Sequence, residues 1–421
     1  MTVIDGPGER THPLTGLILT GGGARAAYQV GVLEAVVAIR KDCHAPPGNP
    51  FPVIAGTSAG AINAAALACG ARDFDAAVST LAAVWSQFHA AQVYRTDSLG
   101  VVRSGARWLT MMSVGWALAR WFRASPKSLL DNSPLQALLQ EWLRLDTLQD
   151  VMREGHLKAL AIAASSYSSG THVTFYDALA EIKPWLRSQR AAVRDRLTVG
   201  HLLASSAIPF LFPAMPLEMP DGTQYFGDGS MRQAAPISPA VHLGAERILV
   251  VGAGRMHEPA DTRASTRGYP TLAAIAGHAL SNIFLDALAV DVERVERVNH
   301  TLSLMTPEAR IASGLRPIEV LVIAPSQRLD DLAARHVGNL PVTVRALLRS
   351  VGVSGRGPEA SGAALASYLL FEAPYTQELM ALGRNDTFAR RDEVARFLGW
   401  DRRAVPRGEP SPQVHGPSVR E

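Results

Sequence analysis

Short apolar runs alternate with segments of helical periodicity near the start of the chain. The run "LTGLILT" (14–20) stops at a glycine triplet, which is typical of a buried strand. The segment after it, "ARAAYQVGVLEAVVAIRK", repeats apolar residues at helical spacing. The run "FPVIAGT" (51–57) predicts a second strand, and "AGAINAAALACG" predicts a helix of small residues. This β-α-β-α order favours a parallel sheet with helices on both faces.

The pattern changes at about residue 327. Before that point, further strands are predicted at 157–167, 171–177, 247–254 and 318–326, with helices at 132–145 and 271–299 among the segments between them. After it, helical patterns continue to about residue 400, and we expect a helical C-terminal extension over 327–400. Residues 401–421 are polar and rich in Pro and Gly, so we expect a disordered tail.

Composition narrows the function classes. The 421 residues carry a net charge of only +3, and no long Lys/Arg run indicates a nucleic-acid partner. Two cysteines, Cys43 and Cys69, cannot form a disulfide framework or a thiolate zinc site. The N-terminus lacks the basic and apolar pattern of a secretory signal. We therefore expect a cytoplasmic protein with no metal, no cofactor and no nucleic-acid partner.

Three long uncharged stretches occur at 51–71, 197–217 and 268–285. The first is broken by Pro, Gly, Ser and Asn, the second holds three prolines, and the third contains His and Asn. A membrane span needs roughly 20 predominantly apolar residues, so we interpret all three as buried core segments.

The pentapeptide Gly56-Thr57-Ser58-Ala59-Gly60 lies between a predicted strand and a predicted helix. A G-x-S-x-G turn in that context exposes the serine hydroxyl at a sharp junction, and the glycines at Gly56 and Gly60 let the backbone pass closely. The free N–H groups at the helix start favour negative charge on the serine oxygen. Alternatively, Ser58 only caps the helix, since serine is a preferred N-cap.

Asp228 stands between Gly227 and Gly229 in "YFGDGSMRQAAPISP". An Asp-Gly pair is by itself a common turn, but beside a serine nucleophile the carboxylate becomes a candidate base. Burial would raise its pKa and make it a better base. The chain order also allows a Ser–Asp–His triad with His242 or His257, although either histidine could be an ordinary structural or solvated residue.

The glycine triplet itself has two interpretations. Strand, Gly21-x-Gly23-x-x-Ala26 and helix together approach the dinucleotide-binding fingerprint. That fingerprint also needs an acidic residue about 20 positions later at the end of a second strand. Asp42 has roughly the right distance but lies in a predicted helix end and loop. The second strand leads to Ser58 instead, which favours a loop that binds a transient oxyanion.

Taken together, "GGGARAAYQVGVL", "GTSAG" and "DGS" resemble the patatin-like phospholipase family over residues 14–240. The segment "ASSAIPFLFPAM" (204–215) is also similar to the family's Ala-Ser-x-Ala-x-Pro segment. The resemblance implies an α/β fold of three layers (α/β/α), in which a mostly parallel central sheet lies between two layers of helices. It makes 14–240 the catalytic domain and 241–326 a continuation of the α/β core.

The resemblance also implies roles for individual residues. Ser58 would be the nucleophile and Asp228 the base of a Ser–Asp dyad that needs no histidine. Gly21, Gly22 and Gly23 would form the oxyanion hole, and Arg25 occupies a position where the family often has a basic residue. Two positions differ from the usual motifs, namely Ala26 in place of Gly, and Ser230 in place of Gly or Ala. Gly56, Gly60 and Gly229 support the site.

The expected function is a serine lipid acyl hydrolase that cleaves carboxylic esters of phospholipids or related lipids through an acyl-enzyme. The alternative is a non-catalytic lipid-binding or regulatory protein on the same fold. Residues 101–127 hold three tryptophans flanked by arginines, a composition that suits a membrane interface. We hypothesise that this segment is a lid or a peripheral membrane contact; a buried helix is the alternative.

Overall fold

A computed structural model describes residues 13–96, 128–256, 271–353 and 362–401, without the side chains of 283–286. The strands are β1 (Thr15–Leu19), β2 (Val53–Thr57), β3 (Ala159–Ser166), β4 (His172–Ala178), β5 (Leu186–Arg187), β6 (Arg190–Arg194), β7 (Met215–Met219), β8 (Gly222–Asp228), β9 (Arg247–Val251) and β10 (Glu319–Ile323). The six strands predicted from apolar runs are confirmed as β1, β2, β3, β4, β9 and β10.

Helices account for most of the remaining described chain. They are α1 (Ala27–Asp42), α2 (Ala59–Cys69), α3 (Phe74–Ser86), α5 (Ser133–Trp142), α6 (Leu148–Arg153), α7 (Val199–Ser205), α8 (Ser238–His242), α9 (Leu272–Ser303), α10 (Pro307–Ser313), α11 (Leu329–His336), α12 (Val342–Ser350), α13 (Ala363–Leu369), α14 (Ala373–Ala389) and α15 (Arg391–Phe397). Two short 3₁₀ helices, η1 (Gly23–Ala26) and η4 (Gly229–Arg232), follow β1 and β8.

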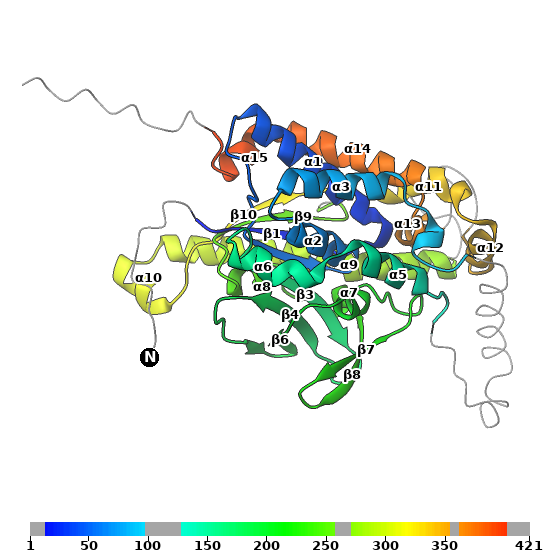
Figure 1. Ribbon diagram of the computed structural model, residues 1–421, viewed down its shortest axis with the longest axis horizontal. Helices are drawn as coiled ribbons and strands as arrows, with labels where there is room; N and C mark the ends of the chain where they lie inside the picture. Colours follow the sequence, from blue (N-terminus) through cyan, green and yellow to red (C-terminus); the bar gives the residue numbers. More distant parts are fainter. Residues whose placement is uncertain (1–12, 97–127, 257–270, 354–361, 402–421) are drawn as a thin grey trace, which may run out of the picture.

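The ten strands form one sheet in the order β10-β9-β1-β2-β3-β4-β6-β5, with the β7–β8 hairpin joined to β3 through β8. Strands β10, β9, β1, β2 and β3 are parallel, whereas β4 and β8 run antiparallel to β3. The predicted mostly parallel α/β architecture is therefore confirmed. Figure 1 shows α1, α3 and α14 together on one side of this sheet.

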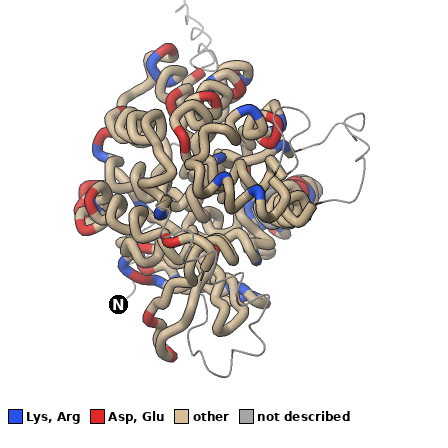
Figure 2. The backbone as a smooth tube through the Cα atoms, turned by 90° about the vertical axis from the view of Figure 1, so that its right-hand side faces the viewer, with Lys and Arg blue, Asp and Glu red and all other residues tan. Residues whose placement is uncertain are grey.

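Each face of the sheet has its own apolar core, because successive side chains on a strand point to opposite faces. On β1, Leu17 and Leu19 join the larger core with α1, α2 and α3, while Ile18 joins the smaller core with α8 and α9. Figure 2 shows basic and acidic positions of both signs scattered over the described backbone, and a few charged side chains, Arg25 and Asp228 among them, are buried.

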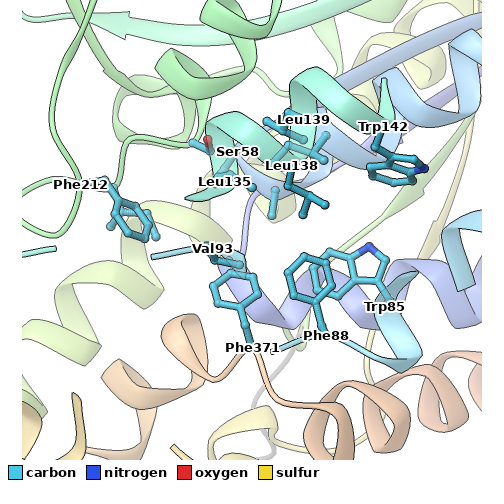
Figure 3. A pocket seen from close by; sticks show the side chains of 15 residues that line it. Ser58, Trp85, Phe88, Val93, Leu135, Leu138, Leu139, Trp142, Phe212 and Phe371 are labelled. Carbon is cyan, nitrogen blue, oxygen red and sulfur yellow. The ribbon is translucent and has the colours of Figure 1, made fainter. Parts of the chain in front are cut away.

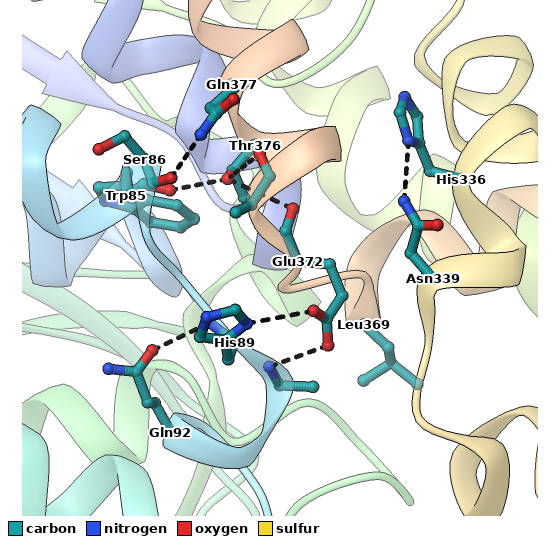
Figure 4. Close-up of polar contacts among 12 residues, drawn as sticks. Trp85, Ser86, His89, Gln92, His336, Asn339, Leu369, Glu372, Thr376 and Gln377 are labelled. Atoms are coloured by element: carbon teal, nitrogen blue, oxygen red, sulfur yellow. Dashed lines mark hydrogen bonds and ion pairs between the residues drawn. The ribbon is translucent and has the colours of Figure 1, made fainter.

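The C-terminal helices pack directly against the N-terminal half of the chain. Helices α1 and α14 touch at two glycines: a Cβ on Gly31 would lie 1.9 Å from the Met380 carbonyl oxygen, and a Cβ on Gly383 would lie 2.2 Å from that of Tyr28. At the start of α14, the Thr376 hydroxyl donates to the Trp85 carbonyl at 2.7 Å (Figure 4). The helical C-terminal region thus covers α1 and α3.

The three uncharged stretches have different outcomes. Residues 51–71 form β2 and α2 inside the core, and 197–217 contain α7 and β7. Among the described helices, α9 alone is long and apolar enough to cross a membrane by length and composition, with a mean hydropathy of 1.5 over its most apolar 18 residues. A core helix of a soluble protein passes the same test, but only 21% of those 18 residues is buried. Residues 272–285 of the third stretch belong to α9, so the interpretation of this stretch as a buried core segment is not confirmed.

Candidate active site

Three of the predicted site segments meet at one edge of the sheet, where the parallel strands end. The glycine loop follows β1 and Ser58 follows β2, and these strands pair with Leu19 opposite Gly56. Asp228 ends β8 and lies opposite Ala164 of β3, next to the point where Thr57 of β2 pairs with Ala163. The register of the sheet therefore brings together residues that are far apart in sequence.

Ser58 occupies a strained turn between β2 and α2. Its φ is 56° and its ψ −132°, a conformation that is uncommon for a residue with a side chain and costs about 1–3 kcal/mol. The side chain makes no capping hydrogen bond to α2, so the helix-cap interpretation of Ser58 is wrong. The residue is 1% exposed, and its Oγ has no hydrogen-bond partner among the described residues.

Glycine is required on both sides of this serine because backbone crowds each position. A Cβ on Gly60 would lie 2.3 Å from the carbonyl oxygen of Leu19. A Cβ on Gly56 would lie 2.5 Å from that of Gly60. Neither obstacle is a flexible side chain, so the strand, turn and helix could not pack this closely with any other residue.

Asp228 is completely buried, and burial raises its pKa to about 6. The Ser58 hydroxyl and the backbone and side chain of Ser230 lower the pKa in part, because they favour the charged carboxylate. Oδ1 accepts a hydrogen bond from the Ser230 N–H at 2.9 Å, while Oδ2 has no partner among the described residues. One carboxylate oxygen is thus held by the turn, and the other is left unengaged beside the serine.

Gly229 lets the turn after Asp228 pack closely against the backbone of β3. A Cβ at this position would be 2.2 Å from the Ala163 carbonyl oxygen, on the strand next to β2. The small residue after it, Ser230, is also buried. Serine at position 230, in place of the usual glycine or alanine, keeps the backbone N–H that donates to the Asp228 carboxylate.

The segment 204–215 connects the two halves of the site. The Ser58 N–H donates to the Ser205 hydroxyl oxygen at 2.8 Å, and the Asp228 N–H donates to the Ala207 carbonyl at 2.9 Å. The sequence showed this segment only as a family resemblance, and the role of Ser205 carried no separate signal. Its two hydrogen bonds fix the serine and aspartate backbones relative to each other.

Buried amides hold the start of the glycine loop. The Gln29 side chain donates to the Thr20 carbonyl at 2.7 Å, and Asn63 donates to Gln29 Oε1 at 3.0 Å. Trp85 completes the chain by donating from its indole nitrogen to Asn63 Oδ1 at 2.9 Å. Sequence reasoning did not identify Gln29 or Asn63, because an isolated amide in a helix carries no motif.

Arg25 does not face the serine. It is 3% exposed and bonds to the C-terminal helices: Nε donates to Ser367 Oγ at 2.8 Å, and a terminal nitrogen lies 2.5 Å from Asp330 Oδ1. Its guanidinium also lies 4.1 Å from the centre of the Tyr368 ring. Arg25 therefore links the glycine loop to a distant part of the chain, and its supporting role in the site stays a prediction.

An apolar cavity begins at Ser58 and is enclosed mainly by helices. It contains about 530 Å³ of empty space, its open mouth included. Figure 3 shows Ser58 at one end, with leucines of α5 along one wall and the rings of Trp85, Phe88 and Phe371 opposite. The lining is almost entirely hydrocarbon, and its remaining members are Gly23, Ala59, Ile62, Val93, Leu135, Leu138, Leu139, Trp142, Ser206, Ile208 and Phe212.

His242, the one described candidate for the third member of a triad, does not reach Ser58 or Asp228. His242 stacks on Trp185, with 4.4 Å between ring centres and 13° between planes, and makes no hydrogen bond to Ser58 or Asp228. His257 and the segment 101–127 lie outside the described residues. Within those residues no group of three or more His, Cys, Asp or Glu side chains is arranged to hold a metal ion.

The match to known proteins agrees with this geometry. A family model described as "Patatin-like phospholipase" matches residues 17–241, more than half of the chain. The chain therefore belongs to the patatin-like phospholipase family, whose members act on lipids.

Solved structures of low similarity are also found. One is VipD from Legionella pneumophila, at 13% identity, covering 88% of this chain and 67% of that one, with a TM-score of 0.30. Another is the complex of SpcU with ExoU from the type III secretion system of Pseudomonas aeruginosa, at 15% identity, 88% and 70% coverage and a TM-score of 0.23. A search of curated proteins finds no match. Scores this low add nothing to what the family match shows.

Proposed function

We propose that the protein hydrolyses carboxylic esters of lipids with Ser58 as nucleophile and Asp228 as base. One observation carries the proposal: an unpaired serine hydroxyl on a strained turn lies beside a buried, half-engaged carboxylate at the end of an apolar cavity. A serine hydroxyl is a poor nucleophile until a neighbouring base takes its proton. Strain and unpaired polar atoms at one place are typical of a functional site.

The first half of the reaction forms an acyl-enzyme. Ser58 Oγ attacks the ester carbonyl carbon while its proton moves to Asp228 Oδ2, and the carbonyl oxygen becomes an anion. Backbone N–H groups of Gly21, Gly22 and Gly23 would donate to that anion, at about 3–4 kcal/mol lost per donor removed. The anion then collapses, the carbon–oxygen bond to the alcohol breaks, and Asp228 returns the proton to the leaving alkoxide.

The second half releases the fatty acid. A water molecule attacks the acyl carbon, its proton passes to Asp228, and the bond to Ser58 Oγ breaks as the serine recovers that proton. Asp228 suits both halves because its pKa of about 6 makes it a stronger base than an ordinary aspartate, yet it is ionised at neutral pH. No further acid or base is needed.

The cavity supports a lipid acyl chain as the group transferred. Its wall of leucine, tryptophan and phenylalanine is almost entirely hydrocarbon and offers few hydrogen bonds to a polar acyl group, whereas burial of each methylene contributes about 0.8 kcal/mol. The cavity starts at Ser58, so a chain lying in it would bring its ester to the serine. Phospholipids, lysophospholipids and acylglycerols all meet this requirement.

The experiment that tests the function is a hydrolysis assay over a panel of lipids and p-nitrophenyl esters, with mass analysis of the products. Wild type should release fatty acid and react with a fluorophosphonate probe, and Ser58→Ala should do neither. Ser86→Ala, on α3 and outside the cavity lining, is the matched control and should retain both activities. A folded wild type that binds lipid vesicles but shows no hydrolysis and no labelling would instead support the non-catalytic alternative.

Peripheral membrane contact through residues 101–127 stays part of the proposal. A protein that hydrolyses lipids has to reach them in aggregates, and the Trp/Arg composition of this segment suits the headgroup layer. Replacing Trp108, Trp116 and Trp121 by alanine should weaken binding to anionic liposomes and lower activity on them. Turnover of a water-soluble ester is the control and should not change. Unaltered liposome binding would contradict the hypothesis.

A further inference from the structure

The glycine loop is in contact with the C-terminal helices at Gly23. Gly23 has a φ of 55°, and a Cβ there would lie 2.3 Å from the Tyr368 carbonyl oxygen. The backbone of α13 therefore forms a wall directly against the residue that also lines the cavity beside Ser58. A shift of α13 would move this wall.

Arg25 fastens the loop to that wall. Two residues beyond Gly23, it lies within the short 3₁₀ helix η1, and its own N–H donates to the Gly22 carbonyl at 3.1 Å. Its side chain is then held from three directions by Asp330, Ser367 and the ring of Tyr368. Both ends of this residue are thus fixed, one in the loop and one in α11 and α13.

Burial makes the partners of Arg25 necessary rather than incidental. An isolated buried charge is costly, and removal of one partner from a buried pair typically leaves the other uncompensated. Asp330 is the only carboxylate hydrogen-bonded to Arg25 among the described residues. A guanidinium without it would have to turn toward solvent, and the loop backbone attached to it would move as well.

We propose that α11 and α13 position the oxyanion-binding glycine loop through Arg25, so that Asp330 and Ser367 are positioning residues for catalysis. The inference rests on the proposed function of the loop. Neither side chain touches the substrate. Each acts by holding the N–H groups of Gly22 and Gly23 where the oxyanion forms, and displacement of such groups by about 1 Å can cost about 100-fold in rate.

A second ion pair between the same two regions provides the matched control. Arg384 of α14 lies 2.6 Å from Glu34 of α1. The Glu34 side chain is half-buried, to the same extent as the Asp330 side chain that pairs with Arg25. It joins the C-terminal helices to the N-terminal half without touching the glycine loop. If these contacts only hold the fold together, loss of either pair should have the same effect.

The experiment compares Asp330→Asn, Ser367→Ala, Asp330→Glu and Glu34→Gln in the full chain, with a soluble ester and a trifluoromethyl ketone lipid that forms an oxyanion mimic on Ser58. Asp330→Asn should lower kcat about tenfold or more with KM unchanged, and should weaken the ketone by the same factor. Ser367→Ala should show the same pattern to a lesser degree. Asp330→Glu should recover most of kcat.

Glu34→Gln should keep wild-type kcat even where it lowers the unfolding midpoint. Equal kcat for Asp330→Asn and Glu34→Gln, or a change in KM alone, would overturn the positioning role while leaving the hydrolase function intact. A wild type without esterase activity would overturn both. If Asp330→Asn does not fold, Ser367→Ala decides, because a kcat and ketone affinity equal to wild type in that variant would also overturn the proposal.

Discussion

Replacement of Asp228 by asparagine should make the protein more stable at neutral pH while removing its activity. Burial raises the folded-state pKa of this carboxyl from 3.8 to about 6, whereas in the unfolded chain it titrates near 3.8. Between those values the folded state holds a proton that the unfolded state has released, so stability falls as pH rises. Above about pH 6 the full cost of the buried charge is present.

The magnitude follows from the pKa difference. The difference between a pKa of about 6 in the folded state and 3.8 in the unfolded state corresponds to roughly 3 kcal/mol. Asparagine has nearly the same shape, keeps an Oδ1 that accepts the Ser230 N–H, and carries no charge. The variant should therefore gain up to about 3 kcal/mol at pH 7.5, and the gain should shrink as pH falls through 6 and be nearly gone at pH 4.

Urea unfolding at pH 4, 5, 6 and 7.5 measures this, because the change in midpoint at constant m-value reports the change in stability. Asp221→Asn, at the exposed tip of the β7–β8 hairpin, controls for a general effect of charge removal. In parallel, kcat of Asp228→Asn should fall by about 10²–10⁴, and wild-type kcat/KM should rise with pH to a half-maximum near pH 6. An Asp228→Asn variant no more stable than wild type at pH 7.5, with a pH-independent difference, would refute the reasoning.

Further predictions concern the backbone and the cavity. Gly60→Ala should not fold stably, because its Cβ would meet the Leu19 carbonyl oxygen at 2.3 Å; circular dichroism and soluble yield check this, and Gly338→Ala, where the backbone is not left-handed and a Cβ meets nothing within 4 Å, is the control. Ser205→Ala leaves the buried Ser58 N–H without an acceptor, so it should cost about 1–3 kcal/mol in urea unfolding and lower kcat. Leu138→Trp should fill the cavity and lower kcat/KM for C16 p-nitrophenyl esters while sparing C4 esters; equal losses for both would contradict an acyl-chain cavity.

Sequence reasoning succeeded where the determinants are local. Strand, G-x-S-x-G turn and helix follow one another between residues 51 and 71, so the pattern predicted β2, the turn and α2 together. The apolar runs likewise predicted the parallel strands, because a strand buried on both faces is continuously hydrophobic. The assignment of Ser58, Asp228 and the glycine loop to catalysis is still a prediction, as is the division of the chain into domains.

The elements that sequence reasoning missed depend on tertiary partners. Strands β7 and β8 pair as a hairpin in which most residues are not buried, because β7 buries only Leu217 and β8 only residues 226–228, so neither forms a continuous apolar run. Helix α14 was not predicted separately, because part of its buried face is Gly383 pressed against α1 rather than a large apolar side chain. The contact of Arg25 with Asp330 joins residues 305 positions apart, which no local pattern can indicate.

The pair of glycines at the crossing of α1 and α14 has a consequence for biosynthesis. Gly31 and Gly383 are about 350 residues apart, and ribosomes add roughly 5–20 residues per second. The apolar face of α1 therefore stays uncovered for roughly 20–70 s, until α14 has been synthesised. During that interval the nascent chain exposes a surface that attracts chaperones and other unfinished chains, so its yield in a cell should depend on translation speed and chaperone supply as well as on final stability.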